Sequence, residues 1–157
     1  MLDTDLVTLI TNTADPEQSL HLYMSDLQYT IRQQSTNQHL LIERRNDELA
    51  RERHCLSQKQ VSDDDFFQSV QQGLSDDMLV AIADDSAAMG ACAEQARVKA
   101  RAYQVMIQKI DTYRQQLQER FTLLRNNESF ILQHYSLATT DPAIMSQMNR
   151  LIHALDE

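Results

Sequence analysis

The strongest pattern of apolar positions lies in the C-terminal half of the chain. Counting from Ile82 in alternating steps of four and three residues reaches Tyr135, and thirteen of the sixteen positions on this path are apolar. A repeat sustained over this length is typical of a helix in a coiled coil. Residues 75–77 (Ser-Asp-Asp) supply a helix start just before the repeat. We therefore predict one long helix over residues 76–137.

The N-terminal half of the chain shows the same spacing with an interruption. Apolar residues at 20, 24, 27 and 31 follow a helix start marked by Asp15 and Pro16. The apolar stripe fails in the polar segment 33–38 and resumes one position out of step at Ile42, Leu49 and Leu56. We predict a helix over residues 16–60 with a register shift near residues 33–39. A break of the helix at that place is the alternative.

Punctuating residues predict shorter helices at the corner and at both ends of the chain. Residues 62–65 (Ser-Asp-Asp-Asp) are typical of a helix start, and Gly73 suits the left-handed residue that follows a helix end. These signals predict a corner helix over residues 63–72. An apolar cluster predicts an N-terminal helix over residues 4–12, and residues 140–142 (Thr-Asp-Pro) begin an amphipathic helix over residues 142–155.

The composition fixes the fold class. The 157 residues include only two glycines and two prolines, whereas sheets and α/β folds need many turns and loops that contain these residues. We predict a single all-α domain over residues 1–157. Its form is an elongated antiparallel helical hairpin, or coiled-coil bundle, of residues 16–60 against 76–137 with short terminal helices. Because the second arm is longer, we expect the terminal helices or a second copy to cover part of it. Its apolar positions near residues 107–135 favour a dimer or a constitutive heteromeric partner.

The net charge of −9 is concentrated in one segment. Residues 60–96 contain eight acidic residues and no Lys, Arg or His, whereas the remainder of the chain contains 15 acids and 14 bases. One interpretation is that these acids cap helix N-termini and keep the protein soluble. The other is an acidic tip that binds a basic partner, with two aromatic anchors between the acids. The candidate partner-binding residues are Asp63, Asp64, Asp65, Phe66, Phe67, Asp76, Asp77, Asp84 and Asp85.

A search for chemically active groups predicts no catalytic, cofactor-binding or metal-binding residue, and no cofactor. No two of the five histidines lie three or four residues apart, and Cys55 and Cys92 form no Cys-x-x-Cys motif. These two cysteines are too few and too far apart for a disulfide framework, so we expect reduced cysteines and a cytoplasmic location. The N-terminus carries acids where a signal peptide carries bases, and no apolar run could span a membrane.

These features favour a non-enzymatic protein–protein interaction module that uses its helix faces and the acidic tip at residues 63–85. Such a module could be an adaptor, a secretion-type chaperone or a structural coiled-coil component. Its partner could also be a second copy of the same chain, which would make a homodimer. In architecture alone, such a hairpin resembles bacterial secretion and flagellar export chaperones and stalk components. Two alternatives stay open: an acidic inhibitor that mimics nucleic acid, and a helical-bundle enzyme with an unrecognised site. The acidic charge argues against direct binding to nucleic acid.

Overall fold

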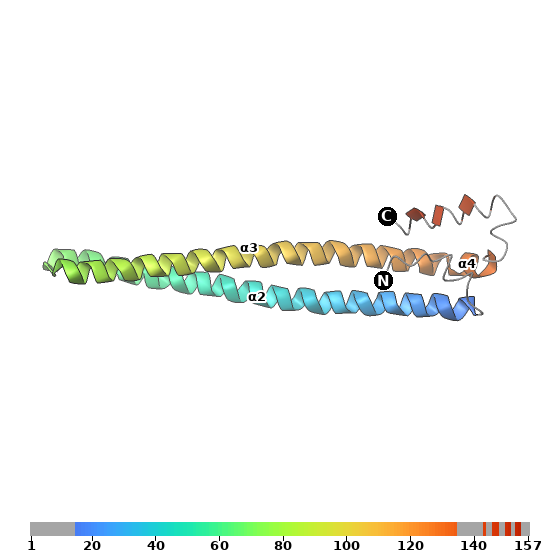
Figure 1. The fold of residues 1–157 in the computed structure, drawn as a ribbon, viewed down its shortest axis with the longest axis horizontal. Coiled ribbons are helices and arrows are strands. Elements are labelled where there is room, and N and C mark those ends of the chain that lie inside the picture. Colours follow the sequence, from blue (N-terminus) through green and yellow to red (C-terminus); the bar gives the residue numbers. More distant parts are fainter. Residues whose placement is uncertain (1–14, 135–142, 144–145, 148–149, 152, 155–157) are drawn as a thin grey trace. The chain divides into compact units, whose positions relative to one another are not determined.

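The computed structural model describes residues 15–134, 143, 146–147, 150–151 and 153–154. These residues form the helices α2 (Pro16–Gln72), α3 (Asp76–Asn126) and α4 (Glu128–His134), with no strand among them (Figure 1). The two long helices pack against each other, which confirms the predicted all-α helical hairpin. The predicted helix over residues 4–12 and the end of the predicted long helix, residues 135–137, lie outside the described residues.

Helix α2 begins where the sequence predicts and ends later. Asp15 caps its first turn, since the carboxylate Oδ1 accepts a hydrogen bond from the backbone N–H of Gln18 at 3.1 Å. The helix then continues to Gln72, so the predicted end at residue 60 and the separate corner helix over residues 63–72 are wrong. Side chains bridge the expected boundary: Lys59 binds Asp63 at 2.8 Å, and Gln60 donates to Asp64 at 3.0 Å. Such contacts between residues four apart support a continuous helix.

The corner itself is a helix cap centred on Gly73. This glycine has a φ of 73°, a left-handed conformation that glycine adopts without steric cost. Its N–H donates to the carbonyl of Val70 at 3.2 Å, and the N–H of Leu74 donates to the carbonyl of Ser69 at 3.1 Å. This pair of hydrogen bonds is a Schellman motif, which satisfies carbonyl groups that the helix end leaves free. The predicted role of Gly73 is confirmed.

Helix α3 ends earlier than the sequence predicts. It stops at Asn126, and α4 begins at Glu128, so the prediction of one uninterrupted helix over residues 76–137 is wrong at Asn127. The side-chain amide of Asn127 donates to the carbonyl of Leu123 at 2.7 Å. This bond competes with the regular helical pattern. The four–three spacing nevertheless persists into α4, where Ile131 is fully buried.

The buried positions of α2 keep one spacing along the whole helix. Every position on the path of alternating four- and three-residue steps from Leu20 to Ser69 is buried or half-buried. Leu56, which the predicted register shift placed in the core, is instead 48% exposed. The predicted shift near residues 33–39 is therefore wrong, and so is the alternative of a break there. From residue 34 onward most of these buried positions are polar: Gln34, Gln38, Arg45, Glu48, Glu52, Lys59, Ser62 and Ser69.

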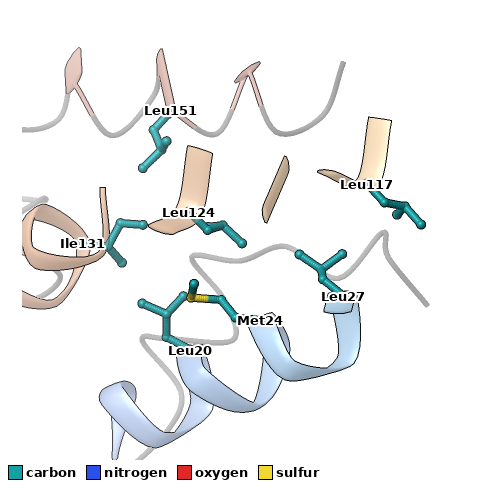
Figure 2. Packing of buried hydrophobic residues seen from close by; sticks show 7 residues of the cluster. All are labelled: Leu20, Met24, Leu27, Leu117, Leu124, Ile131 and Leu151. Atoms are coloured by element: carbon teal, nitrogen blue, oxygen red, sulfur yellow. The ribbon is translucent and has the colours of Figure 1, made fainter. Parts of the chain in front are cut away.

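The chain forms two compact units, which we name the terminal unit (Met1–Ser35 and Thr112–Glu157) and the corner unit (Thr36–Asp111). The terminal unit has a hydrophobic core of side chains from α2, α3, α4 and the C-terminal segment (Figure 2). Its members are Leu20, Met24, Leu27, Leu117, Leu124, Ile131 and Leu151. Burial of Leu151 in this cluster shows that this part of the C-terminal segment packs on the core of the terminal unit. Described residues of that segment are helical.

The corner unit is packed differently. On α3, the buried positions include Ala93, Ala96 and Ala100, which bury little apolar area each. Long polar side chains of α2 reach across to α3: Arg45 donates to Gln104 Oε1 at 2.6 Å, and Gln38 donates to the Asp111 carboxylate at 3.4 Å. These pairs fix the antiparallel register of the two helices within the corner unit.

Candidate functional site

The acidic segment predicted as a partner-binding tip lies at the end of the corner unit where α2 and α3 are joined (Figure 1). Asp76 and Asp77 occupy the first turn of α3, as predicted, where acidic side chains interact favourably with the helix dipole. The acids at 63–65 instead lie inside α2, seven to nine residues before its end at Gln72. The interpretation of residues 63–65 as a helix N-terminus is therefore wrong.

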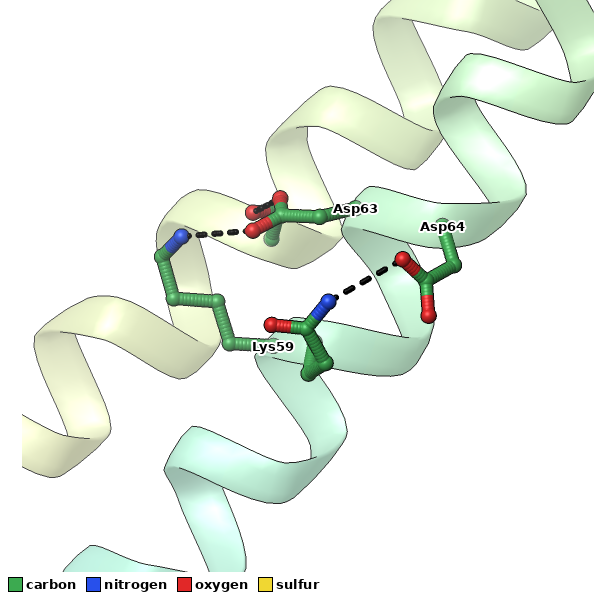
Figure 3. Close-up of polar contacts among 5 residues, drawn as sticks. Lys59, Asp63 and Asp64 are labelled. Atoms are coloured by element: carbon green, nitrogen blue, oxygen red, sulfur yellow. Dashed lines mark hydrogen bonds and ion pairs between the residues drawn. The ribbon is translucent and has the colours of Figure 1, made fainter.

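Asp63 is bound within the hairpin (Figure 3). Its carboxylate accepts hydrogen bonds from the Lys59 ammonium group at 2.8 Å and from the Ser86 hydroxyl of α3. The hydrogen bonds from Lys59 and Ser86 lower the pKa of Asp63 below its ordinary value of 3.8. Asp63 therefore acts as a link between the two helices. This leaves the other candidate acids, which are exposed, for a partner: Asp64, Asp65, Asp76, Asp77, Asp84 and Asp85.

The two candidate aromatic residues have different positions. Phe66 is half-buried on the buried stripe of α2, whereas Phe67 is 65% exposed. Their rings meet edge to face, with 5.7 Å between centroids. This geometry is the favourable one for an aromatic pair. Phe66 therefore belongs to the buried stripe, and its ring contacts the exposed ring of Phe67.

Phe67 belongs to an exposed group of large apolar side chains that the sequence analysis missed. Lys59, Asp63 and Phe67 follow at intervals of four residues and so lie along one side of α2. Lys59 also approaches Gly90 of α3, its Cε lying 3.6 Å from the position a Cβ would take there. On α3, Val80 lies on the same side as Gly90, because 80, 83, 87 and 90 are separated by three, four and three residues. Phe67 and Val80 thus share one flank of the hairpin.

We call this surface the apolar flank and define it as Phe67, Val70 and Val80. Val70 follows Asp63 by seven residues, two helical turns, and therefore lies on the same side of α2. The three side chains are 65%, 50% and 58% exposed. Exposed acids border them at helical spacing, namely Asp64 three residues before Phe67 and Asp84 four residues after Val80. An apolar patch with an acidic border is a surface suited to binding another protein.

A disulfide joins the two helices of the corner unit. Cys55 of α2 and Cys92 of α3 are bonded, with their Cα atoms 6.0 Å apart, and Cys55 is buried. The prediction of two reduced cysteines is therefore wrong. It failed because the two cysteines, 37 positions apart in the sequence, are brought together by the antiparallel register of the helices. No motif in the sequence reports that distance.

No group of three or more His, Cys, Asp or Glu side chains that could hold a metal ion occurs among the described residues. His21 pairs with Glu128 in the terminal unit, and this hydrogen bond is the main cause that raises the pKa of His21 above its ordinary value of 6.5. One surface hollow of about 390 Å³ is lined by α3 residues 115–126, and another of about 500 Å³ by residues 15–25. Each of these two hollows runs along one helix.

No protein-family model matches this chain, and no match was found among the curated proteins or the solved structures. In the part of the chain that the structure describes, no helix is both long enough and apolar enough to cross a membrane.

Proposed function

We propose that this chain is a non-enzymatic protein–protein interaction module and that its apolar flank is the binding surface. The observation that carries the proposal is the exposure of Phe67, Val70 and Val80 within a segment that contains no basic residue. A side chain such as Phe67 gains free energy when a partner removes it from water, roughly 25 cal/mol for each Å² of apolar surface that is buried. Aromatic residues of this kind commonly dominate the affinity of an interface.

The charge around the flank defines the partner's chemistry. Residues 60–96 contain eight acids and no Lys, Arg or His, and Asp64 and Asp84 border the flank. A partner that is itself acidic would meet electrostatic repulsion here, whereas a basic one is attracted and its approach is accelerated. We therefore expect a partner segment that combines Lys or Arg with large apolar side chains, such as a basic amphipathic helix. An adaptor or a chaperone would use such a surface.

The disulfide is relevant to the cellular compartment in which the protein functions. Disulfides persist in oxidising compartments and are rare in the reducing cytosol. The bond between Cys55 and Cys92 therefore favours a compartment that is not reducing, in place of the cytoplasmic location that the cysteine count suggested.

Binding of designed peptides to the full chain tests the proposal. We expect an amphipathic Lys/Leu peptide to bind, measured by fluorescence anisotropy, and a Glu/Leu peptide of the same length not to bind. The Phe67→Ser and Val80→Ser variants should each weaken binding by about tenfold. Leu22→Ser is the matched control, because Leu22 is similarly exposed, at 58%, but lies in the terminal unit. This substitution should leave peptide binding unchanged. Equal binding by all three variants would contradict the proposed site.

Photo-crosslinking in the native cell identifies the partner. A photoreactive phenylalanine analogue at position 67 should capture a defined protein, and the same analogue at position 22 should not. The alternative of a nucleic-acid mimic predicts a different outcome. The captured protein would then bind nucleic acid, the chain would displace that nucleic acid in a steeply salt-dependent way, and Phe67→Ser would have no effect.

A further inference from the structure

We propose that two copies of this chain pair through a second stripe on α3, in a symmetric antiparallel dimer. The stripe lies outside the α2-facing seam of the helix, and we call it the outer stripe. Its members are Asp84, Ala88, Ala91, Gln95, Val98, Ala102, Val105 and Lys109, all of which belong to the corner unit and are exposed. The inference goes beyond the proposed partner binding, because the outer stripe contains none of the residues of the apolar flank.

The spacing of the outer stripe is that of a coiled-coil seam. Its positions follow in alternating steps of four and three residues, which places them along one face of a helix. The face that α3 presents to α2 has the same spacing but contains other residues, among them Ala93, Ala96 and Ile107. Helix α3 therefore has two seams, and α2 covers one of them. Val98 and Val105 on the outer stripe are 54% and 50% exposed.

The outer stripe is complementary to itself when it is reversed. In an antiparallel pair centred between residues 96 and 97, Asp84 lies opposite Lys109 of the second copy, and Ala88 lies opposite Val105 of the second copy. Ala91 then faces Ala102, and Gln95 faces Val98. The twofold symmetry repeats each of these pairs once, as a closed dimer requires. Every small residue meets another small residue or a valine, and each end of the stripe brings an acid to a base.

The charges of α3 favour this orientation and this occupant. Residues 76–96 contain five acids and no base, whereas residues 97–109 contain four bases and no acid. Antiparallel pairing of two α3 helices places the acidic half of each copy on the basic half of the other. In the antiparallel pair, Glu94 flanks the outer stripe and lies near Arg101 of the second copy. Parallel pairing would place acids on acids, and like charges in an interface disfavour that arrangement.

The size of the stripe predicts a reversible dimer. Ala88, Ala91 and Ala102 allow two helices to approach closely, as small residues do, but each buries little apolar area. One helix pair over 26 residues is a small interface compared with those of obligate dimers. We therefore expect a monomer–dimer equilibrium that shifts toward the dimer as protein concentration rises and toward the monomer as salt is added.

Sedimentation equilibrium of the full chain and its variants tests the dimer. Asp84→Lys and Lys109→Asp should each weaken self-association by about tenfold or more, because each change creates two like-charge pairs. The double variant should recover the affinity, because it exchanges the two charges and preserves the pairing. Val98→Asp should abolish the dimer at all accessible concentrations, and Val61→Asp, an exposed position on α2, is the control that should not.

Several results would overturn the proposal. A wild-type chain that stays monomeric over the whole concentration range excludes the dimer. A dimer that survives Val98→Asp, or a double variant that is no stronger than the single variants, excludes this stripe as its interface. All the substituted residues are exposed, so we expect each variant to keep its helices. Circular dichroism of each variant checks this. Val98→Asp, at a position outside the apolar flank and its acidic border, should leave peptide binding unchanged, so the two proposals fail separately.

Discussion

The two units of this protein show two ways of holding a helical hairpin together. The terminal unit buries large aliphatic side chains, and Leu20, Leu27, Leu124 and Ile131 are completely inaccessible. The corner unit buries alanines against long polar side chains and adds one disulfide. Burial of an aliphatic side chain contributes about 1.5–3 kcal/mol, and an alanine much less. The comparison indicates that apolar area stabilises the terminal unit, whereas cross-links and polar contacts stabilise the corner unit.

Polar seams also carry a cost that leucine seams avoid. Glu48 lies on the buried stripe of α2, where its Oε2 atom has no hydrogen-bond partner and lies 3.5 Å from Arg51 Nη1. A buried polar atom without a hydrogen bond is destabilising. This position of the corner unit therefore stabilises the hairpin less than a buried leucine of the terminal unit does.

Truncation of a core leucine in the terminal unit should have the largest effect. Leu124→Ala is expected to lower the free energy of unfolding by about 2–5 kcal/mol, because it leaves a cavity in a fully packed site. Urea denaturation followed by circular dichroism measures the change. Leu22→Ala is the matched control in the same unit, and at this exposed position we expect a change within about 0.5 kcal/mol. Equal effects of the two substitutions would contradict the assignment of the core.

Removal of the disulfide should destabilise the corner unit by a similar or slightly smaller amount. The Cys55→Ser/Cys92→Ser double variant is expected to lose about 2–4 kcal/mol, since the bond closes a long loop in the unfolded chain. Hydrogen exchange should rise mainly in residues 36–111. A reducing agent should reproduce this loss in the wild type and change nothing in the double variant. Free thiols in the wild-type protein, detected by alkylation and mass spectrometry, would show that the bond is absent.

The two glycines should respond to alanine in opposite directions. At Gly90 a Cβ would meet only the Lys59 side chain, at 3.6 Å or more. This ordinary contact leaves room for alanine. Gly90→Ala should therefore raise the melting temperature, by an amount equivalent to about 0.5–1 kcal/mol. Gly73→Ala should lower it, by an amount equivalent to about 1–2 kcal/mol, because its φ is 73°. If both variants shifted the melting temperature in the same direction, the conformation described for one of the two glycines would be wrong.

Acidity should affect the two units in different pH ranges. The pKa of His21 is raised by Glu128, so its contribution is complete below about pH 6.5 and is lost as the pH rises through the raised value. The pKa of Asp63 is lowered by Lys59 and Ser86. Its contribution is complete above about pH 3.8 and is lost as the pH falls through the lowered value.

Melting curves recorded from pH 3 to pH 9 measure both effects. His21→Gln should remove the loss of stability on the alkaline side only, and Asp63→Asn should remove its part of the loss on the acid side only. Both effects are small, because the two groups are near solvent. A change on the opposite side for either variant would be inconsistent with the observed partners.

The sequence predicted α3 much better than α2. Every described position of the predicted α3 seam from Ile82 to Ile131 is buried or half-buried, because most of these residues are apolar and reveal the repeat. On α2 the seam positions from Gln34 onward are mostly polar, so the apolar signal came from Ile42, Leu49 and Leu56 at its edge. Hydrophobic periodicity reports a seam only where the seam is hydrophobic.

The sequence predicted where the acidic segment lies in the hairpin but not how its residues are held. The charge count found the acidic end of the corner unit, and Gly73 correctly marked the turn. Asp63 was counted as a free acid, although Lys59 and Ser86 bind it, and Val70 and Val80 were not recognised as surface residues. A residue's partners across a hairpin depend on the register of two helices, and one helix's sequence does not contain that information.

The sequence by itself determined the helical class, the corner at Gly73 and the asymmetry of charge. Scarce glycine and proline, a four–three repeat and a local count of acids suffice for these, because each depends on neighbouring residues along the chain. Only the tertiary structure decided that α2 continues through residues 61–65, that Cys55 bonds Cys92, and that Phe67 and Val80 share a surface. The disulfide and the shared surface depend on the antiparallel packing of α2 on α3, which brings together residues distant in sequence. The continuation of α2 is supported by contacts between residues four apart and by the Ser86 hydroxyl of α3, which binds Asp63.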